Sequence, residues 1–112
     1  MIWNWRELSE DLRESITRRL ARRGLRPLKS WQWESHGPHL PEMPYQVWIG
    51  RVQCKKHRVQ KWVAIYPYRI YAIGDPSDWW KADPDNQLYA GEPACYKCRE
   101  AARSGPKRPT PL

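Results

Sequence analysis

The first 24 residues have the spacing of apolar positions that is typical of a helix. Apolar side chains recur every three or four residues, which places them in one stripe along one side. Asn4 is a favourable N-cap, and Glu7 lies three residues later, where the second half of a capping box belongs. Gly24 ends the pattern. We therefore predict an amphipathic helix over residues 4–24, whose apolar stripe consists of Trp5, Leu8, Leu12, Ile16 and Leu20.

The spacing then becomes irregular and afterwards alternating. Residues 27–44 mix tryptophan with proline, which predicts an aromatic, proline-rich loop with at most one crossing strand at residues 28–33. Alternation of apolar and polar positions predicts strands at residues 45–53, 58–66 and 68–73. The following segment is rich in Asp, Pro and Asn. It predicts a long loop over residues 74–91, anchored by its two tryptophans, Trp79 and Trp80.

Together these elements predict one small α+β domain. The N-terminal helix would pack on a small antiparallel sheet, and a short C-terminal helix over residues 99–103 would follow. We expect the domain to span residues 1–104, of which residues 45–104 form a metal-binding module. Residues 105–112 have the composition of a disordered basic tail.

The composition shows that this domain needs reinforcement. The chain has 112 residues, with eight Trp, six Tyr and no Phe. A chain of this length buries a smaller share of its surface than a larger domain does, so its core alone gives limited stability. We expect a few large aromatic anchors and an additional cross-link.

The net charge of the chain indicates which class of partner it binds. Twenty Lys and Arg against twelve Asp and Glu give a formal net charge of +8, which favours polyanions such as nucleic acid. Two basic segments, residues 51–61 and 97–108, flank an acidic one, residues 75–92. No apolar run is long enough to cross a membrane, and the first residues lack the order of a signal peptide. We expect a cytoplasmic protein with neither a membrane partner nor a small-molecule substrate, located in the host cytoplasm if a phage encodes it.

The three cysteines fall into two short motifs with metal-ligand spacing. Cys54 and His57 enclose two lysines, and Cys95 and Cys98 enclose Tyr-Lys. Two such pairs supply four ligands for a closed tetrahedral site, so they predict one structural Zn²⁺. The alternative is three buried, reduced cysteines and a surface histidine. A further pair, His36 and His39, could replace His57 or hold a second ion, but we expect it to be solvated or packed in the core.

These pairs and their surroundings resemble a treble-clef or zinc-ribbon module. The first pair lies at the tip of a predicted hairpin, and the second opens a predicted helix. The resemblance covers residues 45–104 and concerns a fold group. It implies a zinc-stabilised module of the kind that binds nucleic acid or protein. The 37 residues between His57 and Cys95 exceed the separation of a minimal ribbon, and an inserted loop over residues 75–91 would account for them.

Two enzyme classes were weighed against the motifs. Nucleobase deaminases share the Pro-Cys-x-x-Cys half of the second motif, but they need an upstream His-x-Glu. His57 is followed by Arg58 and Val59, and His39 by Leu40 and Pro41, so the glutamate is missing. A metal-dependent nuclease would need an oxygen-rich second metal site, for which the spacing gives no sign. We expect a protein without enzymatic activity.

Two functions are left. The first is nucleic-acid binding, mainly through phosphate contacts. Rather than contacting phosphate, the lysines within the two ligand motifs could offset the negative charge of the thiolates. The second is a protein-interaction module: a regulatory, anti-defence or structural subunit of a kind that phages encode, docking through its Trp-, Tyr- and Arg-rich loops. The expected phosphate contacts are Arg51, Lys55, Lys56, Arg58, Lys61, Arg99, Arg103, Lys107 and Arg108, with Arg18, Arg19, Arg22 and Arg23 as a secondary set.

Overall fold

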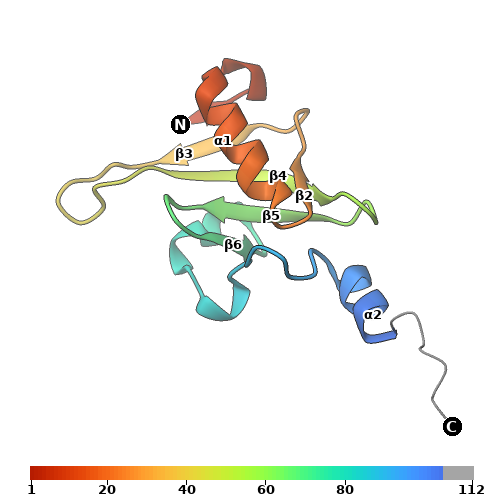
Figure 1. The fold of residues 1–112 in the computed structure, drawn as a ribbon. Coiled ribbons are helices and arrows are strands. Elements are labelled where there is room, and N and C mark those ends of the chain that lie inside the picture. The colour runs from red at the N-terminus through yellow and green to blue at the C-terminus, as the bar shows by residue number, and fades with distance from the viewer. Residues whose placement is uncertain (105–112) are drawn as a thin grey trace, which may run out of the picture.

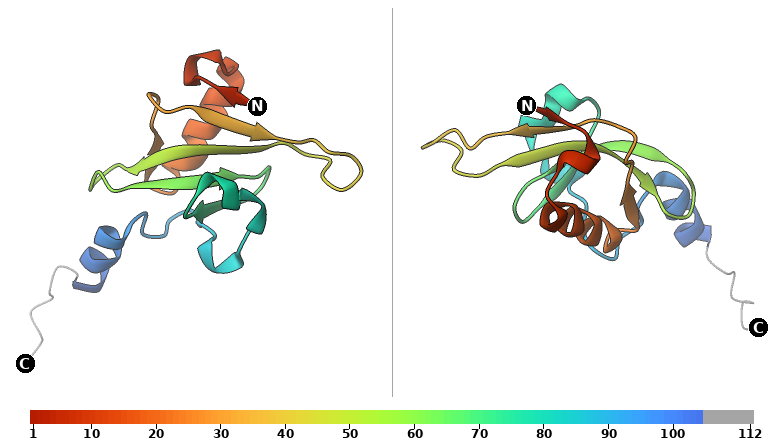
Figure 2. Two further views of the ribbon diagram at one scale, coloured as in Figure 1. Left: turned by 180° about the vertical axis from the view of Figure 1, so that it is seen from behind. Right: turned by 90° about the horizontal axis from the view of Figure 1, so that it is seen from above.

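One antiparallel sheet organises the molecule. The structure is a computed structural model that describes residues 1–104. The sheet has the strand order β1-β3-β4-β5-β6, and β2 also pairs with β4. Helix α1 covers one face, while short 3-10 turns pack against part of the other (Figures 1 and 2). The strands are β1 (Ile2–Trp3), β2 (Leu25–Pro27), β3 (Trp33–His36), β4 (Val47–Cys54), β5 (Gln60–Ile65) and β6 (Ile70–Ile73).

The helices are short apart from α1. The sequence prediction of a small α+β chain with an antiparallel sheet is confirmed. Within residues 1–104, none of the helices combines the length and the apolar composition that crossing a membrane requires. The two α-helices are α1 (Glu10–Ala21) and α2 (Tyr96–Ser104), and the three 3-10 helices are η1 (Trp5–Glu7), η2 (Pro76–Lys81) and η3 (Pro84–Asn86).

The predicted helix over residues 4–24 is interrupted, so that prediction is wrong at its N-terminal end. Leu8 is extended, with φ −70° and ψ 148°, and separates η1 from α1. Ser9 then caps α1, because its hydroxyl oxygen accepts the Leu12 backbone N–H at 3.2 Å. The predicted capping residues, Asn4 and Glu7, cap η1 instead of α1. Glu7 Oε1 accepts the Asn4 N–H at 2.8 Å. The break allows both Trp5 and Leu8 to enter the core.

The two faces of the sheet have separate cores. On the first, Trp48, Val52 and Cys54 of β4 pack with residues of α1 such as Ile16 and Leu20. On the second, alternate residues of the same strand meet the smaller cluster around η2. Successive side chains of a strand point to opposite faces, so β4 contributes to both. The members of the second cluster are Val47, Ile49 and Ala64, with Met43, Tyr66, Ile73 and Trp79 packed against them.

Residues 27–44 form the predicted loop only in part, because strands interrupt it. They contain the end of β2 and the whole of β3, and the crossing strand expected at residues 28–33 is absent. Trp33 explains the difference, because its side chain is fully buried and lies over Gly50 of β4. A Cβ at Gly50 would lie 2.2 Å from the Trp33 ring, so glycine is required for this approach. The three prolines that suggested a loop lie beyond β3, in the turn that projects from the sheet (Figure 2).

Residues 74–91 form the long connection that was predicted, and one of its two tryptophans anchors it. The Trp79 carbonyl accepts the Tyr66 hydroxyl at 2.6 Å, and the Trp79 ring stacks on His36 at 4.4 Å. Trp80 is instead 63% exposed. The connection leads from β6 to α2 and so brings the second cysteine pair back to the sheet.

Candidate metal centre

The first ligand pair lies at the tip of the β4–β5 hairpin, as predicted. Cys54 ends β4, and its backbone N–H donates to Val59 O at 2.9 Å, which closes the turn. Arg58 within the turn has a left-handed backbone, with φ 57°. The Gln53 side-chain amide steadies it by donating to Arg58 O at 3.1 Å. This tight turn folds the His57 side chain back toward Cys54.

The second pair surrounds the start of α2. Cys95 is buried and precedes the helix, while Cys98 lies in its first turn. The Cys98 backbone N–H points at Cys95 Sγ, 3.4 Å away, and Arg99 N–H donates to Cys95 O at 3.0 Å. Residues three apart at a helix start share one side of it, so both sulfur atoms face the hairpin tip.

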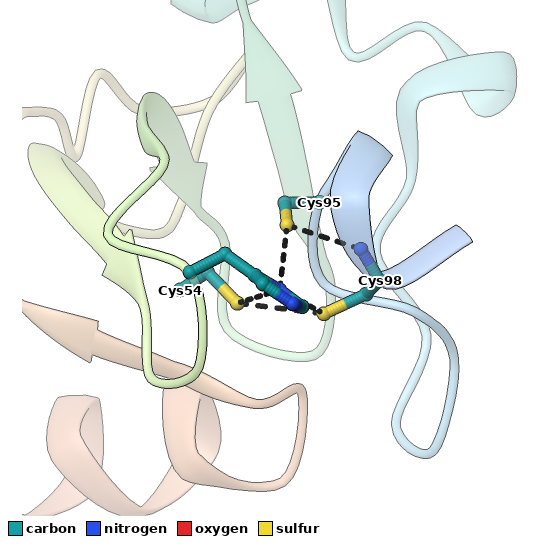
Figure 3. Close-up of side chains that lie close together, drawn as sticks. Cys54, Cys95 and Cys98 are labelled. Carbon is teal, nitrogen blue, oxygen red and sulfur yellow. Dashed lines mark hydrogen bonds between the residues drawn. The ribbon is translucent and has the colours of Figure 1, made fainter. Parts of the chain in front are cut away.

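The four predicted ligands converge on one point, and Figure 3 shows how the three cysteines among them lie. Cys54 Sγ and Cys98 Sγ lie 3.5 Å apart. His57 Nδ1 lies 3.8 Å from Cys54 Sγ, 3.5 Å from Cys95 Sγ and 3.2 Å from Cys98 Sγ. All four ligand atoms lie within 4.8 Å of one another. A tetrahedral ion with ordinary Zn–S and Zn–N bonds would separate its ligand atoms by about 3.6–3.8 Å. The cluster therefore has the dimensions of one metal site.

The sulfur atoms are shielded and are not disulfide-bonded. Cys54 and Cys95 are each 1% exposed, and Cys98 and His57 are partly exposed. The 3.5 Å between Cys54 Sγ and Cys98 Sγ is far longer than a disulfide of about 2.05 Å. All three thiols are free to act as metal ligands.

The surroundings shift the pKa values of two of the thiols in opposite directions. Burial opposes the charge on Cys54, but hydrogen bonds from the Lys56 backbone and from His57 outweigh it and lower the pKa to about 6. Burial, together with its bonds to Cys54 and Cys95, raises the pKa of Cys98. Metal ligands must be deprotonated, and the surroundings favour the thiolate form at Cys54 and oppose it at Cys98.

Lys61 supports the cluster rather than pointing outward. Its Nζ donates to the backbone carbonyl of Ala94, the residue before Cys95. Burial lowers the pKa of Lys61, and the nearby Cys95 partly opposes that shift. This lysine, expected as a phosphate contact, thus joins β5 to the segment that carries the second pair.

The other predicted phosphate contacts lie in different settings. Lys55, Lys56 and Arg58 are exposed at the hairpin tip, and Arg99 and Arg103 are exposed on α2. Arg51 is half-buried on the sheet, with its guanidinium beside two tryptophan rings. Lys107 and Arg108 lie outside the described residues, as does the predicted tail.

The arginines at the C-terminal end of α1 and just after it divide into two kinds. Arg19 Nη2 donates to Tyr66 O at 2.7 Å, and Arg23 Nε donates to Leu88 O at 2.7 Å. These two arginines hold α1 to neighbouring segments. Arg18 and Arg22 are exposed and could reach a ligand.

The histidine pair upstream does not join the cluster. His36 stacks on Trp79, and its Nε2 lies 3.4 Å from Glu34 Oε2. His39 forms a backbone bridge with Met43. Within residues 1–104, the group of potential metal ligands consists of Cys54, His57, Cys95 and Cys98.

Small residues outside the two ligand motifs determine how closely the parts of the site approach one another. Gly24 follows α1 with φ +70°, and its carbonyl accepts the Lys55 backbone N–H at 3.0 Å. A Cβ on Gly24 would lie 3.3 Å from that of Ala94. The sequence pattern predicts Gly24 only as the residue that ends the helix. Its role in the site depends on contacts with distant residues, which the spacing of residues along the chain does not reveal.

A comparison with protein-family models, with curated proteins and with solved structures finds no match to this chain. The site is therefore defined by its own geometry, as a Cys3His cluster that can hold one metal ion.

Proposed function

We propose that the cluster binds one Zn²⁺ and that this ion is structural. Three thiolates and one imidazole are soft or borderline ligands, which suit zinc and fill a tetrahedral sphere. With four protein ligands, no position is left for a reactive water. The ion would link the hairpin tip to α2 and contribute its binding free energy to folding.

The arrangement around this ion is of the treble-clef type. A hairpin tip supplies Cys54 and His57, and a helix start supplies Cys95 and Cys98. The departure from a minimal module is the long connection between them, which includes β6, η2 and η3. That connection packs on the sheet through Trp79.

The function that we propose for this module is binding of nucleic acid through phosphate contacts, without catalysis. The observation that carries it is the hairpin tip, where Lys55, Lys56 and Arg58 are all exposed beside the metal cluster. The surrounding segment, residues 51–61, contains no acidic residue. Exposed cations on a turn that is closed by hydrogen bonds can contact phosphates without refolding of the backbone. Arg99 and Arg103 of α2 would extend the same positive surface.

Salt dependence of binding tests this proposal. A random-sequence duplex and a single strand should bind at low salt, with an affinity that falls steeply as salt rises. The triple variant Lys55→Ala, Lys56→Ala, Arg58→Asn should lower the salt slope by up to about 2.7, if each cation neutralises one phosphate. Asparagine is chosen at residue 58 because it tolerates the left-handed backbone there.

A matched variant controls for net charge. Arg6→Gln, Arg13→Gln, Arg69→Gln removes the same number of cations away from the tip and should leave the slope close to that of the parent. Metal analysis of both variants separates the two roles of the lysines. Loss of zinc from the tip variant would assign Lys55 and Lys56 to the thiolates. Absence of binding at low salt, or equal slopes for the two variants, would refute the proposal.

A protein-interaction role is the second candidate, and exposed aromatic side chains favour it. Trp80 is 63% exposed, Tyr89 48% and Tyr45 39%, all in the connections outside the sheet. Trp and Tyr dominate the energetics of protein interfaces. A partner bound with an affinity that does not change with salt would support this function over the first.

A further inference from the structure

Among residues 1–104, half of one sheet face is left without a covering helix and carries planar side chains. Paired residues in an antiparallel sheet share a face, so Arg51 lies beside Trp62, and Gln53 lies between Arg26 and Gln60. This is the face whose other half is covered by η2. Arg26 and Gln60 are exposed, and Arg51 and Trp62 are partly exposed.

Trp31 completes this surface from the connection between β2 and β3. Its ring is 44% exposed and meets the Trp62 ring edge to face, with 5.5 Å between centroids. The Arg51 guanidinium lies 5.6 Å from the Trp31 centroid and 5.0 Å from that of Trp62. A hollow of about 360 Å³ adjoins the two rings. We name Trp31, Arg51 and Trp62 the tryptophan patch.

The patch is continuous with the hairpin tip. Arg26 donates twice to the Gln53 side-chain oxygen, at 3.2 and 2.9 Å, and the Gln53 amide donates to Arg58 O. Arg26 and Arg51 therefore extend the positive charge of Arg58 onto the sheet. Glu34 is the acidic residue among those that line the hollow.

We propose that the tryptophan patch binds the bases of a single-stranded nucleic acid whose phosphates contact the hairpin tip. This inference rests on the proposed function, because it names the form of nucleic acid that the same surface takes. Exposed aromatic rings beside arginine form a stacking platform, and every base presents a face that can stack. The bases of a duplex are stacked on one another and are not free to stack on a flat sheet face. The patch therefore selects unpaired strands.

The test uses three probes of matched charge: an oligothymidylate of about twelve nucleotides, an abasic strand of the same length and a short duplex. The parent protein should bind oligothymidylate roughly tenfold more tightly than the abasic strand, with quenching of tryptophan fluorescence. Trp31→Ala should remove this preference and leave affinity for the abasic strand and the duplex unchanged. Trp80→Ala is the matched control, since it removes an exposed tryptophan outside the patch.

The outcomes separate this inference from the proposed function. Salt-dependent binding of all three probes with equal affinity would refute base stacking on the tryptophan patch. It would leave the proposed phosphate contacts in place. Binding of none would overturn both. Equal losses from Trp31→Ala and Trp80→Ala would overturn the inference, as would a polyglutamate peptide that competes as well as oligothymidylate. Thermal melts check folding, and Arg51→Gln gives a second substitution in the patch that leaves both rings in place.

Discussion

The half of the molecule under α1 and the end that carries the metal cluster are stabilised in different ways. Under α1, large side chains such as Trp33, Leu20 and Leu25 are fully buried. At the metal end, α2 exposes nearly all of its described side chains, and Cys98 is the one that packs inward. Apolar burial therefore accounts for the first region, and we propose that metal coordination holds α2 at the second, where Cys95 and Cys54 reach the edge of the same core. A small chain can extend its fold beyond its core in this way, without a larger core.

Loss of the metal should have the largest effect, and it should destabilise α2 but not α1. Helix α2 has nine residues, which is shorter than the roughly 12–15 that an isolated helix needs in water. Cys98→Ser, or a strong chelator, should therefore release zinc and remove hydrogen-exchange protection from α2, while the amides of α1 stay protected. Ala101→Ser is the matched change on α2 and should keep one zinc per chain. Equal loss of protection in both helices would contradict the comparison.

Loss of a buried side chain under α1 should have the next largest effect. Here the region under α1 should be weakened while the metal end keeps its ion. Trp33→Ala removes a fully buried ring and should lower the free energy of unfolding by about 3–5 kcal/mol, because a cavity remains over Gly50. Urea denaturation measures the loss, and metal analysis should still find one zinc per chain. Trp80→Ala, at an exposed site, should stay within about 0.5 kcal/mol of the parent. Release of zinc from the Trp33 variant would show that the two regions are not separable.

The smallest of these effects concerns the contact between the regions. Arg23 reaches from α1 to Leu88 O, in the segment that leads to the second ligand pair. Arg23→Gln should cost about 1–2 kcal/mol, since it loses hydrogen bonds from a partly buried charged donor. The neighbouring Arg22→Gln removes an exposed charge and serves as the control. Equal melting temperatures for both variants would show that Arg23 does not join the two regions.

The metal cluster was predictable from the sequence because its signal is local. Each ligand pair has a diagnostic spacing, and alternation around the first pair predicted the hairpin that presents it. The stripe of α1 was likewise readable, although Ser9 and the burial of Leu8 moved its start. These features follow from neighbours along the chain.

The features that sequence reasoning missed depend on distant partners. Strand β3 forms in a proline-rich segment because Trp33 fits over Gly50, 17 positions later, and no local pattern encodes that fit. Arg19 and Arg23 have the composition of a phosphate-binding cluster, yet backbone carbonyls far along the chain accept their hydrogen bonds. Lys61 likewise cannot be told from its neighbours until Ala94 is placed beside it.

The wide separation of the two ligand pairs has a consequence for tolerance to insertion. Cys54 and Cys98 meet across 44 positions, and the connection between them contains η2 and η3 at the surface. The entropic cost of closing a flexible loop grows only with the logarithm of its length, by about 0.6 kcal/mol for each doubling. Lengthening or shortening the stretch between η2 and η3 should therefore change the stability of the metal site little, as long as Trp79 keeps its place. We therefore expect insertions in this part of the chain to leave the geometry of the ligand cluster unchanged.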